Sequence, residues 1–433
     1  MRLLLLPAFL GLAACSTGGE HKPATGHHVS TGSSSPAATA SLAHWEAMFR
    51  ESVTSGDPQG AAQSLTIIAE RWPGSVGQFS KPALYYAIRG ASGDDEQYRL
   101  YRAFLASDAG RQAAGGGYLW REFALMQLQR GEGAAAAASL GFITYPYIVV
   151  SVNADKRFDA IRPRITPALD VDRAAKQEIE AARSEVRLHP DRLEPTGDLL
   201  LALIHARDFA EAVDVGSAAV AKASAPRAPL EYTDYSKQYV WILNYYADAL
   251  GYVGRWTDAV AQLETASRMP EEGQDNISQV INLAQLYARL GQAAAARQTL
   301  RRLPPRLSPY GDMQKAAVEL ESAVQLGDRE EAVRALAFLR AHQADAPYTY
   351  EQALLGADLP DDAAQVLIVR LRDPATRDAA LRSVQHYGNG ATTARRRALD
   401  ARWQAMQAMP EVRDAIAAVG YVANYPSLMV KEE

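Results

Sequence analysis

Cysteine is almost absent from this sequence of 433 residues: the only one is Cys15, close to the amino terminus. With no second thiol, the chain can form no internal disulfide and no zinc site built from several cysteines. Histidine is scarce as well, with eight residues in all, and none of them stands in a pair at metal-ligand spacing such as HExxH. We therefore expect no metal site and no disulfide framework.

Catalytic motifs are also missing. There is no Gly-x-Ser-x-Gly elbow and no P-loop, and the glycine-rich stretch 113–120 lacks both a preceding strand and a following Lys-Ser or Lys-Thr pair. Acidic pairs such as Asp94-Asp95 and Asp361-Asp362 stand at predicted turns or helix starts, where capping and solvation account for them. We expect a protein that is not an enzyme and that uses no cofactor.

Positive charge is nowhere concentrated enough to suggest a nucleic-acid partner. The chain carries 45 Lys and Arg against 50 Asp and Glu, which gives a net charge of −5. A nucleic-acid-binding protein usually shows a basic stripe. The densest basic run is ARRR at 394–397, and a solvated helix face explains it.

The amino terminus carries a short apolar run behind a single charge, Arg2. This run is about ten residues long, whereas a helix that crosses a bilayer needs about 20. Its length and position fit the apolar core of a secretory signal peptide. We therefore expect residues 1–14 to be a signal peptide.

The sequence Leu12-Ala13-Ala14-Cys15 resembles the lipobox of bacterial lipoproteins. The resemblance implies cleavage before Cys15 and attachment of a lipid, such as a palmitate-containing group, to its sulfur. The alternative is an ordinary signal peptide in which the cysteine is incidental. Ser16 follows the cysteine, not Asp, and by the same resemblance this implies an outer-membrane lipoprotein that faces the periplasm.

The segment that follows the cysteine is predicted to be a tether. Residues 16–41 are mainly Gly, Ser, Thr, Ala and Pro, and they hold too little apolar surface to fold alone. Three histidines in this segment, at 21, 27 and 28, have no acidic or thiol neighbours to complete a metal site, so a solvated spacer explains them. We assign residues 15–41 to the lipidated cysteine and a flexible tether.

The rest of the chain shows helical periodicity in repeated pairs of segments. In 244–270, Gly254 separates two apolar helical patterns and is followed by Trp256, and small residues stand at Ala247 and Ala259. This pattern resembles the tetratricopeptide repeat, a hairpin of two helices. Alanine lets the two helices approach closely, the aromatic side chain fills the space beside it, and glycine ends the first helix in a left-handed conformation.

The pattern recurs along the chain. The next two hairpins carry Ala284, Gly291 and Ala296, then Gly327 and Ala332, so the turn glycines are 37 and 36 residues apart. Further hairpins are predicted at 49–74, 84–105, 119–141, 200–223 and 351–374. The predicted fold is therefore an all-α solenoid of tetratricopeptide-like hairpins in two subarrays, 42–165 and 166–373, followed by a helical cap at 374–433. The run 145–152 is the one notable strand-like signal.

The resemblance also implies a binding groove, because the first helix of each repeat lines the concave face in this family. The residues placed there are Trp241, Asn244, Asp248, Tyr252, Asn282, Gln285 and Arg289. The lysines with which the family's best-known clamp holds a peptide carboxylate are absent. Residues 231–246 also hold five tyrosines and a tryptophan, which either pack between helices or form an aromatic platform.

Two functions remain open at this point. The first is a lipid-anchored scaffold of the cell envelope that binds a protein or peptide partner in the groove. The alternative is a glycan-binding module for exported polysaccharide or peptidoglycan.

Overall fold

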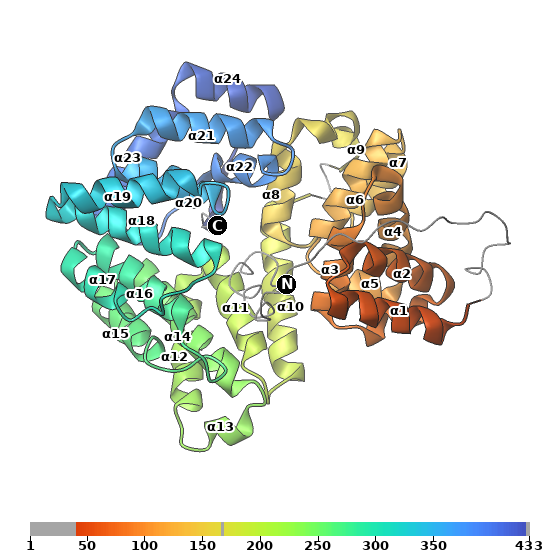
Figure 1. Cartoon of the computed structure of the whole chain (residues 1–433), viewed down its shortest axis with the longest axis horizontal. Coiled ribbons are helices and arrows are strands. Elements are labelled where there is room, and N and C mark those ends of the chain that lie inside the picture. Colours follow the sequence, from red (N-terminus) through yellow and green to blue (C-terminus); the bar gives the residue numbers. More distant parts are fainter. Residues whose placement is uncertain (1–39, 166–168, 430–433) are drawn as a thin grey trace, which may run out of the picture. The chain divides into compact units, whose positions relative to one another are not determined.

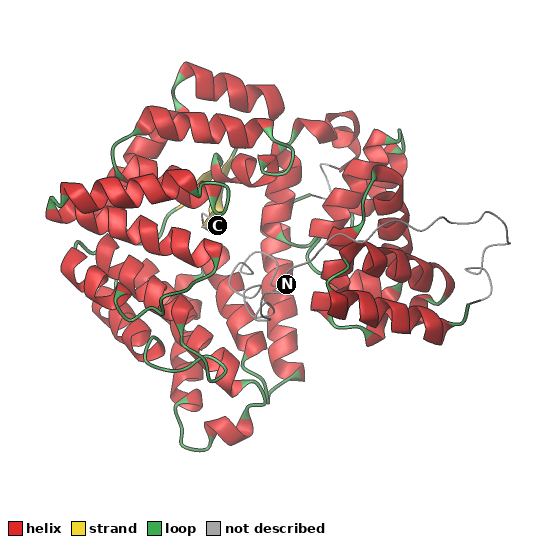
Figure 2. Ribbon diagram, in the orientation of Figure 1, coloured by secondary structure: helices red, strands yellow, loops and turns green. Residues whose placement is uncertain are grey.

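A computed structural model describes residues 40–165 and 169–429. Cys15 and most of the predicted tether lie outside these ranges. The described chain is almost entirely helical and forms two compact units (Figures 1 and 2). Among the described residues, the first unit holds 40–143, 158–165 and 169, and the second holds 144–157 and 170–429.

The first unit consists of short helices that pack as successive hairpins. In chain order its elements are α1 (Leu42–Ser55), α2 (Pro58–Arg71), η2 (Pro73–Gln78), α3 (Lys81–Gly90), α4 (Asp94–Ala106), α5 (Asp108–Ala114), α6 (Tyr118–Gln129), α7 (Gly133–Leu140) and α9 (Arg162–Ile165), and the short η3 (Lys156–Ile161) crosses the boundary between the units.

The second unit holds the longer array. Its elements are α8 (Pro146–Ala154), α10 (Val171–Leu188), α11 (Glu194–His205), α12 (Phe209–Ala223), α13 (Ala228–Glu231), α14 (Tyr235–Tyr252), α15 (Trp256–Ala266), α16 (Ile277–Arg289), α17 (Ala293–Leu300), α18 (Pro309–Leu326), α19 (Arg329–Ala341), α20 (Pro347–Gly356), α21 (Pro360–Arg372), α22 (Arg377–Ser383), β1 (His386–Gly388), α23 (Ala394–Gln407), α24 (Pro410–Val419) and β2 (Asn424–Met429).

Seven hairpins share one turn geometry. The residue between their two helices has a positive φ, and the next amide donates a hydrogen bond of 2.8–2.9 Å to the carbonyl five residues before it, which is the Schellman motif. Glycine fills this position in five hairpins, and Arg207 and Asp358 fill it in the other two. The turn residues are Gly56, Gly131, Arg207, Gly254, Gly291, Gly327 and Asp358.

An alanine stands five residues after each of these turn residues. Six of the seven alanines are fully buried, and Ala332 is half-buried. A methyl side chain at this point lets the second helix lie close against the first. The repeated turn and the repeated alanine confirm the predicted all-α solenoid of tetratricopeptide-like hairpins.

The strand-like run at 145–152 is helical in the structure. It forms α8, which begins with Pro146 at its first position, where proline is well tolerated. All residues of α8 except Asn153 are buried. A helix that is apolar on every side is buried on every side, so its β-branched residues reflect burial and not a strand.

The helices of the second unit pack in a closed circuit. Starting from α8, each helix contacts the next in the order α10, α11, α14, α15, α16, α18, α20, α21 and α22, and α22 returns to α8. The first helices of the hairpins form an inner layer, while α15, α17 and α19 lie outside them (Figure 1). The short parallel pair β1–β2 packs on α11, and its end is tied to α8 by the Tyr147 hydroxyl, which donates to the Met429 carbonyl at 2.6 Å.

No helix within the described ranges is long and apolar enough to cross a membrane.

Candidate functional site

Amide side chains connect the first helices of consecutive hairpins. Asn282 on α16 donates from its side-chain nitrogen to the side-chain oxygen of Asn244 on α14, at 2.7 Å. Asn244 donates in turn to the carboxylate of Asp248, one turn further along α14, at 3.2 Å. Asn244 is buried, Asn282 is half-buried and Asp248 is exposed, so this chain of bonds runs from the helix interface to the surface.

A second chain of bonds continues across the next two helices. Gln285 lies one turn after Asn282 on the same face of α16, and it donates to the side-chain oxygen of Gln314 on α18 at 2.8 Å. Gln314 then donates to the hydroxyl of Thr349 on α20 at 2.7 Å. Every neighbouring pair in the series α14, α16, α18 and α20 is therefore joined by a side-chain amide. We call Asn244, Asn282, Gln285, Gln314 and Thr349 the polar ladder.

Trp241 borders the ladder on α14. Its indole nitrogen donates to the Glu271 carboxylate at 2.7 Å, and its ring lies 5.9 Å from that of Tyr245. Burial raises the pKa of Glu271, and the bond from Trp241 opposes that rise. The carboxylate fixes the orientation of the indole, which remains half-buried.

Tyr252 and Arg289 occupy equivalent positions, two residues before the turns of their hairpins. The Tyr252 ring stacks on Phe209 at 5.1 Å, and its backbone carbonyl accepts a hydrogen bond from the Ala391 amide at 2.7 Å. Arg289 lies near Glu321 on α18. Burial raises the pKa of the Glu321 carboxyl, while the charges of Arg289 and Arg395 act in the opposite direction. Segments from far along the chain thus reach this end of the predicted groove.

The tyrosine-rich segment 231–246 serves mainly as packing. Tyr232, Tyr239 and Tyr246 are buried, and a Cβ at Gly216 would lie only 2.5 Å from the Tyr246 ring. Tyr235 and Tyr245 are half-buried. The structure therefore does not present these rings together as one exposed platform.

The predicted packing residues lie at the helix crossings. Ala247, Ala259, Ala284 and Ala296 are buried, and Trp256 is half-buried, with its ring 3.1 Å from where a Cβ on Gly251 would stand.

Three features of the second unit were not predicted from the sequence. The first is an aromatic cluster in which the Tyr147 ring lies 5.5 Å from Tyr145, 5.0 Å from His205 and 6.2 Å from Tyr387. These rings come from three separate segments, since Tyr145 and Tyr147 are near neighbours in the chain. The sequence carries no local signal for the cluster, because His205 and Tyr387 are far along the chain from the two tyrosines.

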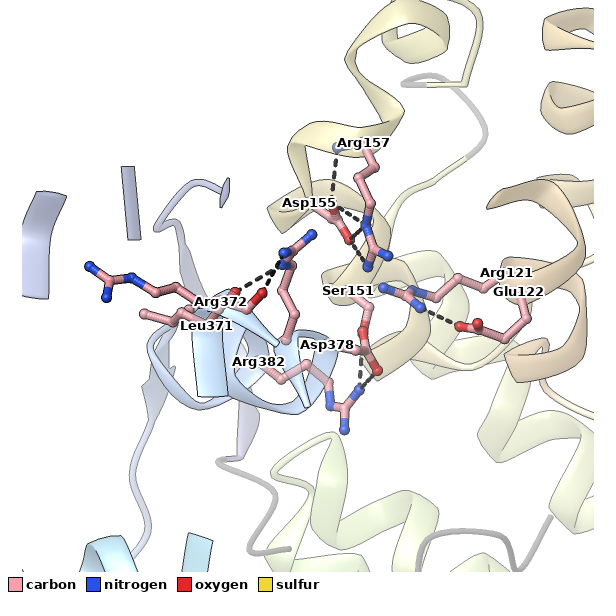
Figure 3. A network of polar contacts seen from close by, with 10 residues as sticks. Arg121, Glu122, Ser151, Asp155, Arg157, Leu371, Arg372, Asp378 and Arg382 are labelled. Atoms are coloured by element: carbon pink, nitrogen blue, oxygen red, sulfur yellow. Dashed lines mark hydrogen bonds and ion pairs between the residues drawn. The ribbon is translucent and has the colours of Figure 1, made fainter. Parts of the chain in front are cut away.

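The second feature lies where the circuit of helices closes. Arg382 on α22 donates to the Ser151 hydroxyl on α8 at 3.2 Å and is paired with Asp378 (Figure 3). In η3, just after α8, the Arg157 guanidinium is paired with the buried Asp155 carboxylate at 2.6 Å. Both arginines are thus held by a carboxylate close to their own backbone.

The third feature is a buried ion pair inside the hairpin of α20 and α21. Arg370 donates to Glu351 at 2.6 Å, and both side chains are almost fully buried. In the hairpins around Gly254, Gly291 and Gly327 the equivalent positions hold only alanine or leucine. The pair is therefore an exception within the repeat.

Within residues 40–165 and 169–429, no group of three or more His, Cys, Asp and Glu side chains could hold a metal ion. Cys15 lies outside the described residues, so its predicted lipidation remains a prediction.

The fold and the ladder define a class: an α-solenoid of tetratricopeptide-like hairpins with a polar inner layer. No protein-family model matches the chain, and no curated protein matches it. One solved structure with a similar arrangement is a Rap protein complexed with competence and sporulation factor, at 13% identity and a TM-score of 0.34, over 86% of this chain and 99% of that one. Another is a circular tandem repeat protein with novel repeat topology, at 13% identity and a TM-score of 0.13, over 87% of this chain and 77% of that one. Likenesses this distant carry no argument about function.

Proposed function

We propose that this protein is a lipid-anchored scaffold of the cell envelope that binds an extended segment of a partner protein along the polar ladder. The observation that carries the proposal is the set of side-chain hydrogen bonds that joins each neighbouring pair of helices in the series α14, α16, α18 and α20. A solenoid needs apolar packing between its helices, but it does not need a line of amides along its inner layer.

Amides suit a peptide backbone because each one offers both a donor and an acceptor. An extended peptide presents the same two groups alternately along its length, and its side chains add specificity. Packed helices lie about 8–10 Å apart, and an extended chain advances about 3.4 Å per residue. A peptide that crosses the three gaps of the ladder would therefore span about seven to nine residues.

The amino-terminal sequence supports a proposed position of the ladder in the cell. Lipidation of Cys15 would attach the chain to the outer membrane, and multiple acyl chains make such attachment stable. A flexible tether of about 25 residues has an average reach of roughly 25–30 Å. The ladder would then sample partners in the periplasm close to the membrane surface.

The proposal is tested by photo-crosslinking in cells. The crosslinking residue p-benzoyl-phenylalanine is placed at position 248, which is exposed at the end of the ladder, and in a matched control at position 333, which is 68% exposed on α19. We expect a discrete protein adduct at 248 that is absent at 333 and is weakened by Asn282→Ala. Adducts of equal strength at both positions, or glycan strands without any protein, would contradict the proposal.

A further inference from the structure

The carboxyl ends of the first helices share one edge of the second unit, and a single segment of the chain runs along that edge. The first helices of successive hairpins point the same way, so α11, α14, α16, α18 and α20 all end on this side. Residues 389–402, which we call the strap, comprise the segment after β1 and the first part of α23. The strap contacts the ends of α11, α14, α16 and α20 in that order.

The contacts begin at α11 and α14. Just after α11, the Arg207 guanidinium donates to the Asn389 carbonyl at 2.6 Å. At the last residue of α14, the Tyr252 carbonyl accepts from the Ala391 amide at 2.7 Å. Gly390 lies so close to Tyr252 that a Cβ there would stand 2.9 Å from the tyrosine side chain. Only a residue without a side chain fits at that point of the strap.

The contacts continue to α20. Arg395 lies beside the turn after α16, with its Nε 3.6 Å from where a Cβ on Gly291 would stand. Arg402 donates to the Leu355 and Gly356 carbonyls at the end of α20, at 2.9 and 3.2 Å, and its Nε is 3.2 Å from the Asp358 carboxylate. The last carbonyls of a helix carry partial negative charge and attract cations. In the run 394–397, Arg395 and Arg397 are exposed, as expected of a solvated helix face. Arg395 and Arg402 are the arginines of the strap that lie at the negative ends of the helices.

The strap is weakly buried compared with the elements on either side of it. Within the strap no residue is fully buried: Leu399 is partly buried against the core, and Asn389 and Ala391 are exposed. Met406, the only buried residue of α23, lies after the strap. Hydrogen bonds and exposed ion pairs are readily exchanged for contacts with water, and segments with few buried apolar contacts open at low free energy. On one side β1 pairs with β2, and on the other Val412 and Ile416 of α24 are buried in the core. The strap could leave the edge while both of its ends stay in place.

We propose that this edge is an interaction surface for a basic segment with a glycine before its arginines. In the structure the strap occupies this surface as an intramolecular ligand. A partner segment of the same chemistry binds there by displacing the strap. The proposal goes beyond the polar ladder, because it concerns the helix ends and not the inner layer. A tethered segment competes at an effective concentration in the millimolar range, so a free segment is excluded until the strap is loosened.

The test uses the full chain and a fluorescein-labelled synthetic peptide of residues 386–407, followed by fluorescence anisotropy. Gly390→Val and Arg402→Ala loosen the strap and leave the edge itself intact. We expect the double variant to bind the peptide at least tenfold more tightly than the unsubstituted chain does. The matched control is Arg397→Ala, which removes an equal charge from α23, since Arg397 contacts only the Thr392 carbonyl within the strap. This control should bind no better than the unsubstituted chain.

Further measurements separate this proposal from its alternatives. Hydrogen exchange at the Ala391 amide should accelerate in the double variant, while its circular dichroism spectrum stays unchanged. Absence of peptide binding in the opened variant, equal binding by all chains, or equal binding of a scrambled peptide would overturn the proposal. Asn282→Ala should leave the affinity of the opened variant for this peptide unchanged. A loss there would mean that the peptide lies on the polar ladder, and would overturn the edge proposal while leaving the proposed function standing.

Discussion

The side chain of Asn282 donates a hydrogen bond of 2.7 Å to that of Asn244, which lies on the first helix of the preceding hairpin. The bond links two helices that are separated in the chain by the whole of α15. Gln285 and Gln314 repeat the arrangement across the next pair at 2.8 Å. A polar contact repeated at consecutive helix pairs sets the register of the inner layer and leaves a line of amides along it.

The buried pair of Glu351 and Arg370 gives a prediction about stability. Removing one partner leaves an uncompensated buried charge, so Glu351→Ala or Arg370→Ala should lower the free energy of unfolding by about 3–5 kcal/mol. Replacing both with leucine should recover most of that loss, because other hairpins use alanine or leucine at these positions. Urea unfolding followed by circular dichroism measures the effect. A double variant less stable than either single variant would refute this account of the pair.

The turn glycines give a second prediction, which concerns backbone conformation alone. Gly327 has φ +70°, and a Cβ there would meet nothing within 4 Å. Gly327→Ala should therefore destabilise the protein by about 1–2 kcal/mol through left-handed strain only. Gly356 also has open space, but it ends a helix without a positive φ, so Gly356→Ala should be neutral or stabilising. Equal melting temperatures for the two variants would show that the turn does not require glycine.

Glu321 gives a prediction about pH. Burial raises the pKa of its carboxyl above the ordinary value of 4.5, despite the nearby charges of Arg289 and Arg395. The folded state therefore favours the protonated form, and its contribution to stability is present at low pH and is lost as pH rises through the raised pKa. The glutamine of Glu321→Gln does not ionise, so this variant does not lose stability at that position as the pH rises. The melting temperature of Glu321→Gln, relative to that of the unsubstituted chain, should therefore rise as the pH is raised from 4 to 7. A difference that stays constant over that range would contradict the assignment.

The lipid anchor is tested by metabolic labelling with an alkyne analogue of palmitate. The lipobox-like sequence predicts that the chain becomes labelled and that Cys15→Ser abolishes the label. Ser16→Ala, beside the modified residue, should keep it. Label that persists in Cys15→Ser, or is never incorporated, would show that Cys15 is not the anchor.

The sequence predicted those parts of the fold that depend on local, repeated signals. Gly254, Gly291 and Gly327 mark their turns because a left-handed residue follows the first helix in each hairpin. An alanine five residues after the turn also marks the two hairpins in which Arg207 or Asp358 stands in place of the turn glycine. The β-branched run in α8 was ambiguous because a fully buried helix and a buried strand have similar compositions.

Contacts between distant segments left no such local signal. The bond from Arg382 to Ser151 joins residues 231 positions apart, and the one from Tyr147 to Met429 spans 282. The groove residues Asn282 and Gln285 were predicted from their place in the repeat, but their partners Gln314 and Thr349 were not. The sequence shows that an amide side chain can form hydrogen bonds. Its partner is determined by how the helices pack, which the sequence does not show locally.

The most direct test of the central claim measures peptide affinity at the ladder. The partner segment found by crosslinking at position 248 is synthesised and titrated by calorimetry into the full chain, Asn282→Ala and the control Gln298→Ala, which changes an exposed residue on α17. Asn282→Ala removes one amide and leaves the Asn244 oxygen without its donor, so it should weaken binding about tenfold, or about 1.4 kcal/mol. Gln298→Ala should bind as the unsubstituted chain does. Equal affinity in all three proteins would contradict the claim that the polar ladder is the binding surface.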